Sequence, residues 1–247
     1  MTQTIGAFIT ATLITLFATP IVRILAVRWK LVDDVRKRPH PAHTHVGIVP
    51  RAGGLAIYLG TITGILIFLP ITKLVIGIII ATSILTLVGL LDDKGDVSPY
   101  LRLATNITAA IIVIGAGAGI PYITNPVTGA VIHLDTWRIS FSFFGTHSLL
   151  VWADLFAFIW ILWTMNITGW SAGVDGQMPG FVTISAFILG LLSLRYSAVD
   201  PSQLYVTILA FLVSGSFLGF LPWNVFPQKI MPGYSGKTLA GFFLAIL

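Results

Sequence analysis

The chain alternates between long apolar runs and short polar segments. Continuous apolar stretches cover residues 4–27, 53–70, 72–91, 101–121, 149–167, 178–195 and 202–222, and a further one begins near residue 238. Each is close to the ~20 residues that an α-helix needs to cross a bilayer. None has the alternating ten-residue pattern that is typical of membrane β-strands. The pattern therefore predicts an all-α multi-pass membrane protein with about eight transmembrane helices.

Residues 122–147 differ from the rest of the chain. Asn125-Pro126 and Thr128-Gly129 are turn signals, and Val131, Ile132 and Trp137 favour strands. We predict a small hairpin here, on the outer face. The whole chain, 1–247, is predicted to form a single transmembrane domain. Because it stops inside an apolar stretch, we expect this domain to continue beyond Leu247.

Composition and charge agree with a membrane protein and indicate its orientation. Hydrophobic residues make up 56% of the chain and charged residues 9%, whereas a soluble domain carries roughly 25% charged residues. With the N-terminus outside, eleven of the 14 Lys and Arg residues fall on the inner side, as the positive-inside rule requires. The net charge of +5 follows from this asymmetry and does not indicate nucleic-acid binding. The absence of cysteine excludes disulfides and cysteine nucleophiles.

The acidic residues give the first candidate chemistry. All nine are Asp, and six of them fall on the inner side of this threading. Asp92-Asp93 ends an apolar helix, where the helix dipole disfavours negative charge. The pair is either a solvated helix terminus or a site that binds a divalent cation or accepts a proton from a phosphate.

Three further inner segments carry candidate binding residues. The loop 36–54 contains Arg, Lys and His side chains, which either contact lipid headgroups or bind substrate phosphates. Gly53-Gly54 in this loop suits either close helix packing or close approach of the backbone to a ligand. In segment 166–176, Asp175 either caps the next helix or contacts a ligand. Gly233, Gly236 and Lys237 lead into the last helix, as an ordinary turn or as a phosphate site.

These motifs, in this order, resemble the polyprenyl-phosphate N-acetylhexosamine-1-phosphate transferases from about Val32 to the end of the chain. Segments 123–135 (ITNPVTGAVIHLD) and 45–54 (HVGIVPRAGG) look closer to the undecaprenyl-phosphate N-acetylglucosamine-1-phosphate transferases than to the muramoyl-pentapeptide branch. The resemblance implies transfer of N-acetylglucosamine 1-phosphate from a UDP-sugar to a polyprenyl phosphate such as undecaprenyl phosphate, with release of UMP. It implies a place in cell-wall or surface-polysaccharide synthesis, in the plasma membrane with the active face cytoplasmic.

The resemblance also implies a cofactor, partners and site residues. The cofactor is Mg²⁺, with Mn²⁺ as the alternative; the partners are the UDP-sugar, the lipid phosphate and the membrane, and a homodimer is left open. Asp92 and Asp93 are implied as the catalytic pair, and both together with Asp175 as metal ligands. Substrate binding is implied for Arg36, Lys37, His45, Arg51, Arg102, Asn166, Asp175, Gly233 and Lys237.

Some positions depart from the family pattern. Gly169 and Ala172 stand where Asn and Asp are usual, and Gly-Asp-Ser-Gly-Ser is replaced by Gly-Tyr-Ser-Gly-Lys at 233–237. Tyr234 thus takes the place of a metal-binding Asp, and a phenol is a poor Mg²⁺ ligand. The alternative to a transferase is therefore a member that binds lipid phosphate or nucleotide-sugar without turnover. A transporter ranks last, because the polar residues gather at one face and not at mid-depth.

Overall fold

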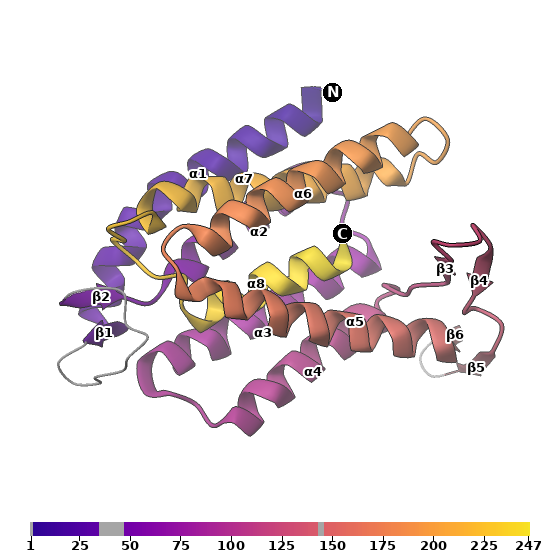
Figure 1. The fold of residues 1–247 in the computed structure, drawn as a ribbon, viewed down its shortest axis with the longest axis horizontal. Helices are drawn as coiled ribbons and strands as arrows, with labels where there is room; N and C mark the ends of the chain where they lie inside the picture. Colours follow the sequence, from indigo (N-terminus) through magenta and orange to yellow (C-terminus); the bar gives the residue numbers. More distant parts are fainter. Residues whose placement is uncertain (1, 35–46, 143–145) are drawn as a thin grey trace.

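The predicted apolar stretches all form helices in the computed structural model, which describes residues 2–34, 47–142 and 146–247 (Figure 1). Within these ranges there are eight α-helices: α1 (Thr2–Arg28), α2 (Gly53–Phe68), α3 (Lys73–Gly95), α4 (Pro99–Gly115), α5 (Val151–Trp170), α6 (Gln177–Tyr196), α7 (Gln203–Asn224) and α8 (Gly233–Ile246). Five of the described helices, α1, α3, α5, α6 and α7, are long and apolar enough to cross a membrane. The all-α multi-pass prediction is confirmed.

Helix α4 is shorter than the apolar stretch 101–121 predicted. It starts at Pro99, where Ser98 accepts a hydrogen bond from the Leu101 N–H, and it ends at Gly115. The chain leaves the helix because Gly117 has a φ of +118° and Pro121 follows shortly after. Apolar composition alone therefore overestimated the length of this helix.

Helix α7 lies between α1 and α6 and is largely buried. A side chain at Gly215 or Gly219 would collide with the backbone of Phe8 or Thr12, so these glycines allow α1 to approach closely. Short helix α8 lies in the middle of the bundle, against α5, α3 and α2, and Phe242 is fully buried there. The first turn of α8, Gly233–Lys237, is thereby held at the ends of α2 and α3.

The strands in the described ranges form three small antiparallel pairs at the two ends of the bundle. They are β1 (Val32–Asp34) with β2 (Ile48–Pro50), β3 (Tyr122–Thr124) with β4 (Val131–His133), and β5 (Arg138–Ser142) with β6 (Thr146–Leu150). The single hairpin predicted for 122–147 is thus two, because Asn125 already closes the first turn by accepting hydrogen bonds from the N–H groups of Val127 and Thr128. Pair β1–β2 was not predicted. Figure 1 shows it at the opposite end of the molecule from the other two pairs.

Candidate functional site

The acidic pair lies at the end of α3, in a turn that returns the chain toward itself. Asp96 has a φ of +45° and ends the helix. The Val97 N–H donates to Asp92 Oδ1 (3.1 Å), and Ser98 then caps α4. This turn directs the first helical turn of α4 back over the pair.

Asp92 forms an ion pair with Arg102 of α4. The Arg102 Nε donates to Asp92 Oδ1, and the Asp92 side chain is only 1% exposed, against 32% for Arg102. The Arg102 guanidinium also lies 5.3 Å from the centre of the Tyr234 ring, and its Nη2 is 3.9 Å from Asp96 Oδ1. Arg102 therefore joins the end of α3 to the start of α8.

Asp93 connects α3 to two other segments. Its Oδ1 accepts a hydrogen bond from the Tyr234 N–H (2.8 Å) and lies 3.6 Å from the Arg51 Nε. Its Oδ2 is buried and has no hydrogen-bond partner among the residues that the structure describes. Gly233 has a φ of +69°, and a Cβ there would collide with Asp93 Oδ2, so only glycine allows this approach. One carboxylate oxygen is thus buried against the Gly233 backbone and unpaired within the described residues.

Arg51 is held in position by its backbone. Its N–H donates to the Leu31 carbonyl (2.8 Å), and it forms a parallel bridge with Met231 just after β2. The Met231 carbonyl in turn accepts from the Gly53 N–H (2.9 Å). Gly53 and Gly54 pack against Phe220 and the start of α8, which favours helix packing over ligand approach for this pair of glycines.

Lys237 completes the group. Burial lowers the pKa of Lys237 below its usual value. Its ammonium also interacts electrostatically with Arg51, Asp93, Arg102 and Asp92. Burial also raises the pKa of the Tyr234 phenol, which therefore stays neutral. We call the six side chains gathered here the charged cluster: Arg51, Asp92, Asp93, Asp96, Arg102 and Lys237.

Asp175 does not cap α6, although that was one interpretation of its position. The residue that precedes α6 is Gly176, and Asp175 Oδ2 accepts from the Gln228 N–H (3.1 Å). Buried Asn224 accepts from the Gly176 N–H (3.1 Å) and donates to the Ile230 carbonyl (3.0 Å). These contacts join the α5–α6 connection to the segment before α8. Asn224 was missed from the sequence, where the only signal was a polar residue ending an apolar run.

The other predicted site residues fall into two groups. Arg36, Lys37 and His45 lie outside the described residues. Asn166 is exposed on α5, and its amide donates to the Leu162 carbonyl of its own helix. One turn later, Gly169 lies against Lys237, with 3.9 Å between an added Cβ and the Lys237 Cβ. The end of α5 thus reaches the charged cluster.

The three-carboxylate metal site that the resemblance implied is not formed. Among the described residues, no three His or Asp side chains gather closely enough to hold an ion. Asp175 Oδ2 accepts from the Gln228 N–H, and its buried Oδ1 has no partner among the described residues. Tyr234 offers a phenol, and Arg51 and Arg102 already pair with the two aspartates. The residues present do not fit a Mg²⁺ ion bound by Asp92, Asp93 and Asp175. Whether the protein depends on Mg²⁺ stays a prediction.

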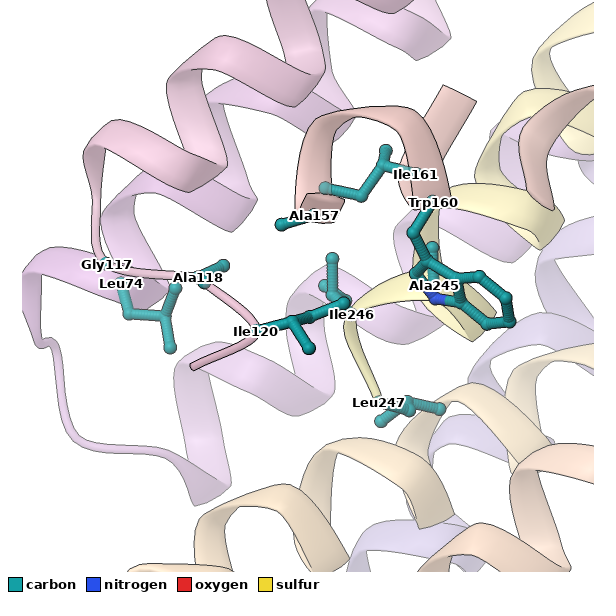
Figure 2. Close-up of a pocket in the computed structure, with 11 residues that line it drawn as sticks. Leu74, Gly117, Ala118, Ile120, Ala157, Trp160, Ile161, Ala245, Ile246 and Leu247 are labelled. Atoms are coloured by element: carbon teal, nitrogen blue, oxygen red, sulfur yellow. The ribbon is translucent and has the colours of Figure 1, made fainter. Parts of the chain in front are cut away.

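Two cavities lie away from the charged cluster. One, of about 440 Å³, is lined by apolar residues of α3, α5 and α8 and by the segment 117–120 (Figure 2). The other, of about 870 Å³, lies between α4, α5 and the start of α3 and includes Lys73 and Asp154. Asp154 Oδ2 accepts from the Leu150 N–H (2.9 Å), so this carboxylate caps the start of α5. Neither cavity contains a predicted site residue.

The fold and the site together define a helical membrane protein with a buried acidic pair, surrounded by partly exposed cations, at one end of its bundle. The sequence model of the family described as glycosyl transferase family 4 matches residues 75–247. This match covers more than half of the chain and includes the acidic pair, Asp175 and the first turn of α8. The chain belongs to glycosyl transferase family 4.

Curated relatives agree with this assignment. A probable undecaprenyl-phosphate N-acetylglucosaminyl 1-phosphate transferase of Bacillus subtilis is 28% identical over 100% of this chain and 63% of its own length. The decaprenyl-phosphate N-acetylglucosaminephosphotransferase of Mycobacterium leprae is 31% identical over 96% of this chain and 58% of its own. An undecaprenyl-phosphate alpha-N-acetylglucosaminyl 1-phosphate transferase of Thermotoga maritima is 28% identical, over 94% and 61%. The chain therefore spans about three fifths of the length of these relatives.

Proposed function

We propose that this protein transfers N-acetylglucosamine 1-phosphate from a UDP-sugar to a polyprenyl phosphate and releases UMP. The names of its relatives support a polyprenyl phosphate as the acceptor and N-acetylglucosamine 1-phosphate as the transferred group. The observation that carries the proposal is Asp93: a buried carboxylate with one unpartnered oxygen, between Arg51 and Lys237, at a helix end. Such a site can bind phosphates and accept a proton from one of them.

The reaction requires one bond to form and one to break. An oxygen of the lipid phosphate attacks the phosphorus that carries the sugar; the bond from this phosphorus to the UMP oxygen breaks, and a lipid diphosphate-sugar results. Phosphoryl transfer depends mainly on positioning and on charge stabilisation. Arg51 and Lys237 supply positive charge to the phosphates, Asp93 Oδ2 accepts the proton of the lipid phosphate, and Asp92 orients Arg102.

The proposal is tested by the release of UMP from UDP-N-acetylglucosamine by purified protein supplied with undecaprenyl phosphate. We expect Asp93→Asn to abolish release, because an amide does not accept the proton, and Asp92→Asn to lower it strongly. Asp154→Asn at the other end of the bundle is the matched control and retains activity. Normal release by Asp93→Asn at equal expression would refute the proposed role of the pair.

The second candidate is a member that binds nucleotide-sugar without turnover, which Tyr234, Gly169 and Ala172 favour because they replace polar residues of the family pattern. It predicts that UDP-N-acetylglucosamine binds but that no UMP is released at any Mg²⁺ or Mn²⁺ concentration. The same assay, run beside a binding measurement, separates the two candidates.

We also propose that the charged cluster faces the cytoplasm, as the distribution of Lys and Arg predicts. The chain has no cysteine, so a single introduced one reports its own accessibility. Tyr100 is 85% exposed near the cluster, and Val127 is 90% exposed at the opposite end. In intact cells an impermeant thiol reagent should label Val127→Cys and leave Tyr100→Cys unlabelled; the reverse result would invert the topology.

A further inference from the structure

Three cations approach the acidic pair from three different elements. Arg51 follows β2, Arg102 belongs to α4 and Lys237 to α8. With Asp92, Asp93 and Asp96 they make three positive and three negative side chains, so the charged cluster is formally neutral. Each aspartate of the pair already has an arginine on its Oδ1.

This charge balance does not suit a divalent cation. A Mg²⁺ site needs carboxylate oxygens that no other cation occupies. Within the described part of the chain, Asp93 Oδ2 is the one buried oxygen of the pair that lacks a hydrogen bond. An ion at that oxygen would be repelled by Arg51 and Lys237. An anion, in contrast, would be attracted by Arg51 and Lys237, and both side chains are partly exposed.

Three of the departures from the family pattern, Gly169, Tyr234 and Lys237, lie close together in space. Tyr234 and Lys237 are three residues apart on α8, and side chains at this spacing share one face of a helix. Gly169 of α5 lies against Lys237: a Cβ at position 169 would be 3.9 Å from the Lys237 Cβ, an ordinary van der Waals contact. The carboxylate lost at 234 and the ammonium gained at 237 therefore occur in the same part of the site.

We propose that in this protein the Lys237 ammonium, with Arg51, takes the role of a divalent cation, so that the charged cluster binds the phosphates of a nucleoside diphosphate without Mg²⁺. The inference rests on the proposed function in its choice of ligand. Its test measures UDP binding and does not require transfer activity. A protein that binds UDP but transfers no sugar phosphate would therefore still test the inference.

The experiment measures the Kd of UDP for the purified protein by calorimetry, once in EDTA and once with excess Mg²⁺. We expect the two constants to agree within about threefold, which is less than the tenfold change that ~1.4 kcal/mol produces. Lys237→Met should weaken binding roughly tenfold to a hundredfold, the loss expected when one hydrogen bond to a charged group is removed. Lys237→Arg, which keeps the positive charge, should retain most of the affinity for UDP.

Lys94→Met is the matched control, because Lys94 is exposed on the last turn of α3 and its charge is screened by water. It should bind UDP as the parent does. A parent protein that binds UDP only with Mg²⁺, or not at all, overturns the proposal without any variant. Equal binding by Lys237→Met and Lys94→Met also overturns it, provided both elute as monodisperse species.

Discussion

Arg102→Met tests whether the α3–α4 ion pair supports the fold. The Asp92 carboxylate is 1% exposed, and apart from Arg102 it accepts a hydrogen bond from the Val97 N–H. Removing Arg102 leaves a buried charge without its counter-ion, which costs about 3–5 kcal/mol when both partners are fully buried. Because Arg102 is 32% exposed, water already weakens the pair, and we expect a loss of about 2–3 kcal/mol.

The reasoning predicts that the partner substitution largely relieves this loss. Asp92→Asn keeps an oxygen for the Val97 N–H and removes the buried charge, so alone it should cost about 1 kcal/mol. In the double variant, Arg102→Met no longer leaves an unpaired carboxylate. The double-mutant cycle should therefore give a coupling energy of about 1–2 kcal/mol, well above the ~0.5 kcal/mol seen for independent sites.

The measurement is the free energy of unfolding in mixed micelles of dodecyl maltoside and SDS, followed by circular dichroism at neutral pH. Arg138→Met is the control, because Arg138 is exposed on β5 at the other end of the molecule, and it should change stability by less than about 0.5 kcal/mol. Additive effects of the Arg102 and Asp92 substitutions would show that the pair does not stabilise the described fold.

Three further substitutions probe the start of α8. Gly233→Ala should destabilise by about 2 kcal/mol or more in the same unfolding assay, since φ is +69° and the new Cβ meets Asp93 Oδ2, whereas Gly95→Ala, with open space around it, should be nearly neutral. Tyr234→Asp combined with Lys237→Ser, which removes the repelling ammonium, should create a Mn²⁺ site detectable by electron paramagnetic resonance, whereas Tyr234→Asp alone should not. Mn²⁺ binding by the Tyr234→Asp variant alone would contradict the proposed repulsion by Lys237. Lys237→Met should raise the melting temperature at pH 7, because burial disfavours the charged form of this lysine and lowers its pKa. Between the lowered pKa and 10.5, the folded parent binds fewer protons than the unfolded chain, so the stability of the parent rises with pH over this range. The gain from the substitution should shrink over that range, and a gain independent of pH would contradict this explanation.

The sequence by itself determined the helices and their membrane character. Apolar runs leave the backbone no alternative to a helix in lipid, so the eight helices were predictable from composition along the chain, although only five of the described helices are long and apolar enough to cross a membrane. One local signal also sufficed: Asp92-Asp93 was recognisable as a candidate site from two adjacent acids at the end of an apolar run.

Only the tertiary structure decided how these residues are paired. Arg51 and Asp93 are far apart in the chain and belong to different elements, and Tyr234 reaches Asp93 through its backbone N–H, which no side-chain motif reports. Asp175 binds Gln228 and is not gathered with the acidic pair, contrary to the metal site implied by resemblance. Hydropathy depends on each residue's own side chain, so it can be read from the sequence. The charge balance of the charged cluster depends instead on which side chains are brought close together by the packing of α2, α3, α4 and α8.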